Sequence, residues 1–201
     1  TEDVSSPWFK FPLRLPDAKQ RLFVFHHAGG SSSAYVKWKD HLPPGVELVL
    51  VELPGRASRH REAAIVDFTA LVAALRVEII PELHCPSSLF FGHSLGALVA
   101  FELHRALPAE LANRVRAMAL SSFLPPTPAN IANREKIAHL SDEEFLQKIA
   151  GYAPLPQGTS VDADTLAFFL DIIRKDILLI ESYEDRPQKQ IPGGTPLLIL
   201  G

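Results

Sequence analysis

The chain has 201 residues, of which 47% are hydrophobic, a net charge of −3 and a single cysteine, Cys85. This length suits one α/β domain with a sizeable core, and the charge gives no sign of a nucleic-acid partner. One cysteine excludes a disulfide framework and a clustered-thiol metal site. No secretory segment is visible and no apolar run reaches transmembrane length, so we expect a cytoplasmic protein that does not enter the membrane.

The first third of the chain predicts three strands. Residues 8–13 are consistent with an edge strand. Residues 21–25 are apolar after their first position, as in the central strands of parallel sheets, and residues 46–51 predict the next strand.

The loop after the second strand, residues 26–33, contains two glycines and three serines. Such a loop can aim backbone N–H groups at a developing oxyanion, although alone it would be read as a plain turn. Its serines are expected to cap a short helix over residues 34–42, with Tyr35, Trp38 and Leu42 on one face.

A basic cluster follows the third strand: Arg56, Arg59, His60 and Arg61. It could meet a phosphate or an acidic partner. A solvated loop is the more common explanation of such a cluster, and we favour it.

The stretch Gly92-His93-Ser94-Leu95-Gly96 has the Gly-x-Ser-x-Gly pattern of a nucleophile elbow. Glycines on both sides let backbones approach a strained serine closely. A buried strand over residues 88–91 and a helix over residues 97–107 supply the strand–turn–helix context that the motif requires, and an inert serine in a glycine turn is the alternative. In that helix, Glu102, His104 and Arg105 are expected to face solvent.

A helix capped by Asp67 and running to Ile80, and a strand over residues 116–121, continue the alternation of strands and helices. This alternation predicts a mostly parallel sheet with helices on both faces. It stops at residue 125 and resumes near the C-terminus. We therefore divide the chain into a first part of the core (1–124), a helical lid insertion (125–184) and a return to the core (185–201).

The insertion contains a capping box at Ser141, which opens a helix, and a long apolar helix that starts at Asp164. The apolar residues of the long helix cover more than one face. Core packing would explain them, and so would a cavity lining, for which the candidate acyl-pocket residues are Phe168, Phe169 and Ile172.

Taken together, Phe25-His26-His27-Ala28-Gly29-Gly30-Ser31, Leu53-Pro54-Gly55-Arg56, the elbow and the lid insertion resemble the type II thioesterases of polyketide and nonribosomal-peptide assembly lines, an α/β-hydrolase family. The resemblance spans about residues 23–201. The position of His26 is usually proline in that family.

The resemblance implies that Ser94 is the nucleophile and that the N–H groups of Ala28 and Leu95 form the oxyanion hole. The implied substrate is an acyl group on the phosphopantetheine arm of an acyl or peptidyl carrier protein, cleared by editing or release in antibiotic biosynthesis. We expect no cofactor, no metal and a monomer.

The family places the triad acid and histidine after the strand that matches residues 196–200, so we expect both beyond Gly201, together with a last strand and helix that this chain lacks. Two alternatives stay open. One is a generic carboxylester or lipid hydrolase. The other, for the chain as given, is a carrier-binding protein without catalysis.

Overall fold

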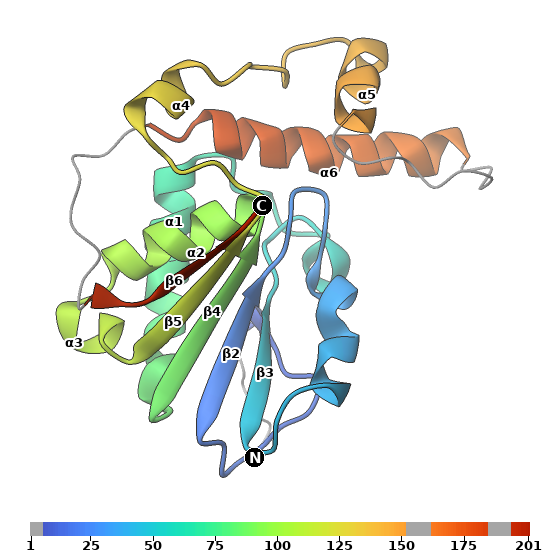
Figure 1. Ribbon diagram of the computed structural model, residues 1–201. Helices are drawn as coiled ribbons and strands as arrows, with labels where there is room; N and C mark the ends of the chain where they lie inside the picture. The colour runs from blue at the N-terminus through green and yellow to red at the C-terminus, as the bar shows by residue number, and fades with distance from the viewer. Residues whose placement is uncertain (1–5, 152–161, 185–193) are drawn as a thin grey trace.

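The computed structural model describes residues 6–151, 162–184 and 194–201. Their core is a six-stranded sheet of order β1-β3-β2-β4-β5-β6 (Figure 1). The strands are β1 (Phe9–Lys10), β2 (Gln20–Phe25), β3 (Val46–Val51), β4 (Ser87–His93), β5 (Val115–Ser121) and β6 (Leu197–Leu200). All neighbours pair in parallel except β1, which is antiparallel to β3. The mostly parallel sheet predicted from the sequence is confirmed.

The edge strand expected over residues 8–13 is shorter than predicted. It pairs through Phe9 and Lys10 alone. Pro12 has no backbone N–H to continue a ladder, which accounts for the early end.

Alternation along the strands divides the core between the two faces of the sheet. Phe23, Phe25, Val49 and Val51 pack on the first face, where the helices α1 (Phe68–Ile79) and α2 (Leu95–Ala106) cover the sheet. On the other face, Val24, Leu48 and Leu50 pack against Tyr35, with Trp38 and Leu42 beside them. The predicted apolar face of residues 35, 38 and 42 is thus confirmed.

The elements outside the lid have the following bounds: 3-10 helices η1 (Ser32–Asp40), η2 (Ala57–Arg59) and η3 (Ile80–His84), and α-helices α1 (Phe68–Ile79), α2 (Leu95–Ala106) and α3 (Ala109–Ala112). Asp67 caps α1 by accepting a hydrogen bond from the Ala70 N–H (2.7 Å), as predicted.

Two expectations for these helices are wrong. Residues 32–40 form a 3-10 helix, and Ser31 does not cap it because its hydroxyl hydrogen-bonds Ser33 (2.7 Å) instead. Glu102 and His104 are buried, not solvent-facing, because Tyr183 donates a hydrogen bond to Glu102 and Thr195 reaches the His104 ring.

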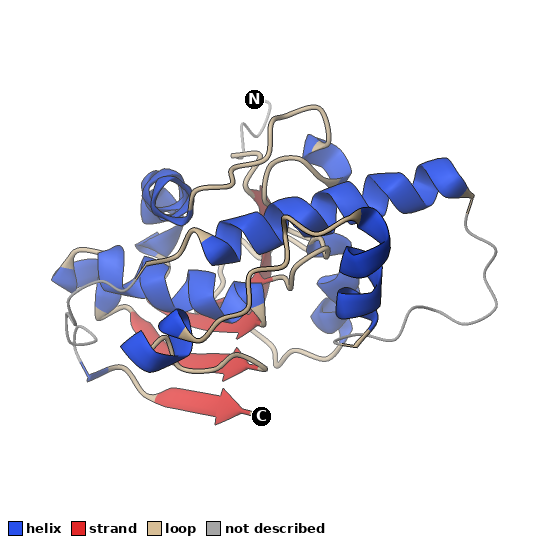
Figure 2. Ribbon diagram, turned by 90° about the horizontal axis from the view of Figure 1, so that it is seen from above, coloured by secondary structure: helices blue, strands red, loops and turns tan. Residues whose placement is uncertain are grey.

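The lid elements lie above the carboxyl ends of the strands (Figures 1 and 2). They are α4 (Pro128–Ala132), α5 (Asp142–Ala150) and α6 (Ala163–Glu181). The capping box at Ser141 is confirmed. The long helix begins at Ala163, since Asp162 and not Asp164 accepts the capping hydrogen bond, from the Thr165 N–H (2.9 Å). Of the helices in the described part of the chain, none combines the length and the apolar character needed to cross a bilayer.

Candidate active site

Ser94 occupies a strained turn between β4 and α2. Its backbone dihedrals are φ 53° and ψ −117°, a combination that a residue with a side chain rarely adopts. The Ser94 N–H donates a hydrogen bond to the Ser121 carbonyl at the end of β5 (2.8 Å), which helps to hold the turn. A serine at a strand-to-helix turn in this conformation is the arrangement of a nucleophile elbow.

The glycines of the elbow are required by close backbone approach. A Cβ on Gly92 would overlap the backbone of Gly96, and a Cβ on Gly96 would overlap the Phe25 carbonyl at the end of β2. Both obstacles are backbone atoms that cannot move aside cheaply. The close backbone packing that the sequence pattern predicts at these two glycines is therefore present in the structure.

The β2 loop (residues 26–31) lies beside the elbow because β2 and β4 are neighbours in the sheet, with Phe25 opposite Gly92. Ala28 and Ser94 line the same cavity. The backbone N–H groups of Ala28 and Leu95 donate no hydrogen bond to any residue that the structure describes. They are free to bind an external acceptor beside the serine.

The Ser94 cavity has a volume of about 380 Å³ and lies between the sheet and the lid. Its lid side is largely apolar, with Ile173, Ile177 and Ile180 contributed by α6. Its lining residues are His27, Ala28, His93, Ser94, Arg134, Glu135, Ile137, Ile149, Ile173, Ile177, Ile180 and Glu181. An apolar chain of moderate length would fit this space with its polar end at Ser94.

The predicted acyl-pocket residues do not line this cavity. Phe168 and Phe169 are each 49% exposed, and Ile172 is buried elsewhere. Figure 1 shows the first turns of α6 extending past the sheet, which leaves the two phenylalanines without a core to cover. The prediction that α6 lines a cavity holds for three isoleucines that the sequence reasoning did not single out.

Two histidines, His27 and His93, line the cavity together with Ser94. The His27 and His93 rings meet edge to face, with centroids 5.8 Å apart, and the His93 ring lies 3.1 Å from the Ser121 hydroxyl. Burial and the neighbouring His93 lower the pKa of His27. Neither ring hydrogen-bonds the Ser94 hydroxyl within the described residues.

The preference for a solvated basic loop is wrong for two of its four members. Arg56 and Arg59 are buried, at 3% and 5% exposure, whereas His60 and Arg61 are exposed. Arg59 pairs with Glu62 (2.6 Å). Arg56 forms a bidentate ion pair with Asp176 of α6 (2.6 and 2.7 Å), a partner 120 positions away in the sequence.

Sequence reasoning missed Asp176 altogether. The available signal in the sequence is that this carboxylate lies between the apolar residues Ile172 and Leu179 of the same helix. In the structure both of these residues are buried. A lone acid among buried positions implies a buried partner.

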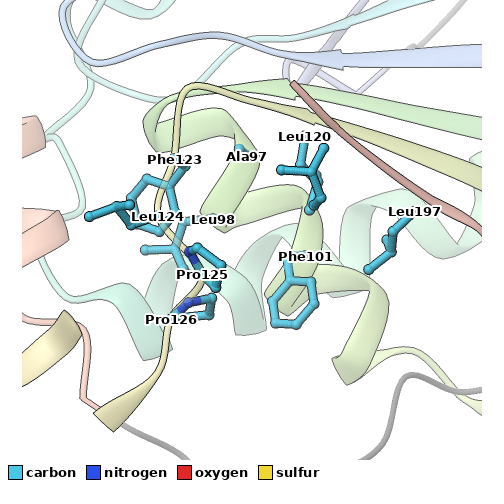
Figure 3. Close-up of a pocket in the computed structure, with 10 residues that line it drawn as sticks. Ala97, Leu98, Phe101, Leu120, Phe123, Leu124, Pro125, Pro126 and Leu197 are labelled. Carbon is cyan, nitrogen blue, oxygen red and sulfur yellow. The ribbon is translucent and has the colours of Figure 1, made fainter. Parts of the chain in front are cut away.

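A second cavity, the flank cavity, lies between α2, β6 and the loop after β5 (Figure 3). Its volume is about 300 Å³ and its lining is apolar: Ala97, Leu98, Phe101, Leu120, Phe123, Leu124, Pro125, Pro126, Leu197 and Ile199. Ser94 is not among these residues, and the flank cavity offers no group that could act on an ester or thioester. In the described ranges, no cluster of three or more acidic, histidine or cysteine side chains could hold a metal ion.

Residues 20–198 match the family model described as a thioesterase domain. The chain is 33% identical over 199 residues to linear gramicidin dehydrogenase LgrE of Brevibacillus parabrevis, a match that covers 98% of this chain and 74% of LgrE. It is 31% identical to gramicidin S biosynthesis protein GrsT of Aneurinibacillus migulanus, covering 88% and 68% of the two chains. The solved type II thioesterase BorB from the borrelidin biosynthetic cluster superposes with a TM-score of 0.77 at 29% identity, covering 92% of this chain and 74% of BorB.

Proposed function

Because the chain belongs to the thioesterase family, we propose that it hydrolyses acyl thioesters carried on the phosphopantetheine arm of carrier proteins, as an editing or release enzyme of polyketide or nonribosomal-peptide assembly lines. The observation that carries the proposal is the strained Ser94 in the lining of a cavity with an apolar lid side. The name of LgrE includes a dehydrogenase activity, but no Gly-x-Gly-x-x-Gly dinucleotide pattern follows a strand here.

In this proposal the Ser94 Oγ attacks the thioester carbonyl, the pantetheine thiolate leaves, and water then hydrolyses the acyl-serine. The N–H groups of Ala28 and Leu95 stabilise the oxyanion, aided by the positive end of the α2 dipole. The proton of Ser94 passes to a general-base histidine, as in the triads of serine hydrolases. The isoleucines of α6 give the Ser94 cavity the apolar surface that an acyl chain requires.

The test is Ser94→Ala in the full-length protein, assayed with an acyl-pantetheine thioester. We expect turnover to fall by several powers of ten, as on loss of other triad members. Ser33→Ala is the matched control. Ser33 is an exposed serine of η1, and its replacement should leave turnover unchanged. An alanine variant of Ser94 within about tenfold of the parent would reject the assignment.

The oxygen ester of the same acyl group separates the proposal from a generic ester hydrolase. A thioesterase should prefer the thioester in kcat/KM, and a carrier-bound acyl group should exceed the free acyl-pantetheine. Equal or greater activity on the oxygen ester would contradict the proposed substrate class.

A further inference from the structure

We propose that Asp176 is a positioning residue that makes the geometry of the β2 loop depend on the seating of the lid helix α6. The inference rests on the proposed function, because it treats the N–H of Ala28 as an oxyanion donor. It concerns a buried contact between two segments that are far apart in the chain.

The Asp176 carboxylate joins three segments. Its Oδ2 accepts hydrogen bonds from the Gly29 N–H (2.7 Å) and from Arg56 Nη1 (2.7 Å), and its Oδ1 accepts from Arg56 Nη2 (2.6 Å). Arg56 Nη1 also donates to the Gly30 carbonyl (3.2 Å). One carboxylate on α6 and one guanidinium thus hold two consecutive residues of the β2 loop.

Both charges of the pair are removed from water: Asp176 is 2% exposed and Arg56 is 3% exposed. A buried charge whose partner is removed is left uncompensated at high cost. Lifting α6 would expose or isolate both charges. The ion pair therefore strongly favours the seated position of α6, even over positions displaced by a small distance.

Gly29 supplies a second and independent contact with α6. Its φ is 74°, and a Cβ at this position would lie 2.5 Å from Cγ1 of Ile173. The Ile173 side chain of α6 therefore occupies the space beside Gly29 that a side chain at position 29 would need. Ile173 and Asp176 are three residues apart and so lie on one face of the helix.

These contacts lie directly next to the Ala28 N–H. The hydrogen bond from Gly29 to Asp176 orients the peptide that follows Ala28, and the Gly30 N–H closes the turn on the His27 carbonyl (3.0 Å). With α6 seated, the peptides around Ala28 are held from two sides. With α6 lifted, the Gly29 N–H loses its acceptor and the turn regains its glycine freedom.

The first experiment is Asp176→Asn in the full-length protein. Loss of a single oxyanion donor costs about 100- to 1,000-fold in kcat, so a displaced donor should cost about 10- to 100-fold, with KM for the acyl-pantetheine within about twofold. The matched control is Arg174→Gln on the same helix. Arg174 also makes three hydrogen bonds, to Ala138, Leu140 and Asp142, but all of them stay within the lid. The control should keep most of kcat.

The second readout separates positioning from general damage to the lid. A boronic acid with the same acyl chain forms a tetrahedral adduct with Ser94 and needs the oxyanion donors, whereas a thioether analogue of the substrate needs only the cavity. Asp176→Asn should weaken boronate binding about 10- to 100-fold and leave thioether binding unchanged. Equal weakening of both ligands, or the same profile in Arg174→Gln, would overturn the proposal.

If Asp176→Asn does not fold, Asp176→Glu decides. It keeps the charge beside Arg56 but displaces the oxygen that accepts from Gly29, so we expect the same selective loss of boronate affinity, and parental affinity would overturn the proposal. Failure of the proposed function is distinguishable: it would appear as an active Ser94→Ala, whereas an inactive Ser94→Ala with a parental Asp176 variant rejects only the coupling.

Discussion

His26 stands where the resembled family usually has proline, and its side chain is buried at 2% exposure. Its Nδ1–H donates to the His27 carbonyl (2.9 Å), while Nε2 has no partner among the described residues. Burial first, and then the positive charge of Arg56, lower the pKa of His26 to about 4, against smaller opposing effects of the hydrogen bond to the His27 carbonyl and of Asp176. The folded protein therefore holds this ring neutral.

A neutral buried histidine makes stability depend on pH in a defined direction. Below the unfolded pKa of 6.5 the unfolded chain takes up a proton that the folded protein refuses, so stability falls as the pH drops from 6.5 towards 4. Between about pH 7 and pH 5 this residue should remove about 2 kcal/mol from the free energy of unfolding, at about 1.4 kcal/mol per pKa unit.

The measurement is urea unfolding at both pH values for the parent and for His26→Gln. Glutamine has no charge to gain, so the variant should lack this part of the pH slope. His27 and His104, whose pKa values are also lowered by burial, contribute equally to both proteins and cancel in the difference. Parallel slopes would show that His26 titrates normally in the fold.

At the level of single residues, the sequence predicted what a local pattern encodes. The turn at Ser94, with its two glycines, and the proximity of Ala28 follow from short motifs at the ends of neighbouring strands. The apolar neighbours of Asp176 hinted at a buried partner, but the burial of Arg56 and its pairing with Asp176 could not be predicted, because the two positions are 120 residues apart and only the folded chain brings them together.

At the level of elements, α6 has two tasks. Ile173, Ile177 and Ile180 face the Ser94 cavity, and Asp176 contacts the β2 loop. The apolar residues at the start of the helix do neither, since Phe168 and Phe169 are about half exposed and contact each other with ring centroids 6.0 Å apart.

This division predicts which residues of α6 set the acyl-chain preference. Ile177→Trp should fill part of the 380 Å³ cavity and lower the kcat/KM ratio of long to short acyl-pantetheines at least about tenfold, since single methylenes are discriminated by about 10- to 200-fold in apolar pockets. Phe169→Trp on the exposed end of the same helix is the matched control, and its ratio should stay within about twofold. A shift of equal size in the control would indicate that the phenylalanines form the acyl site.

Elements were predictable where their signal is local. Apolar runs gave β2 and β3, and side-chain caps gave the starts of α1 and α5 at Asp67 and Ser141. The 3-10 conformation of η1 was not predictable, because the serines that could cap an α-helix bond to one another instead. The cavity-facing side of α6 was not predictable either, since its apolar residues cover more than one face and only the position of the helix over the sheet selects one.

At the scale of the whole molecule, the two edges of the sheet differ. β1 is a two-residue edge, whereas β6 presents four apolar side chains that are 38–58% exposed. Leu197 and Ile199 point to the flank cavity and Leu198 to the opposite face. Long apolar edges offer unpaired backbone groups to other chains.

We therefore expect the chain of 201 residues to aggregate on concentration through β6. Leu198→Lys should slow aggregation several-fold, because a lysine on an edge strand disfavours pairing with another edge. Val77→Lys is the matched control, since Val77 is 66% exposed and belongs to α1, not to a strand. Light scattering at equal protein concentrations measures the aggregation rates of both variants, and equal rates would exclude β6 as the contact between chains.

The backbone contacts of Ser94 also determine when its turn can form during synthesis. The Ser94 N–H is bound by Ser121, and Gly96 packs on Phe25, so every strand that holds the turn has been made once β5 leaves the ribosome. Domains commonly begin to fold while later segments are still being translated. Asp176 emerges afterwards. The residues that hold the Ser94 turn are therefore all synthesised before the acceptor of the Gly29 amide.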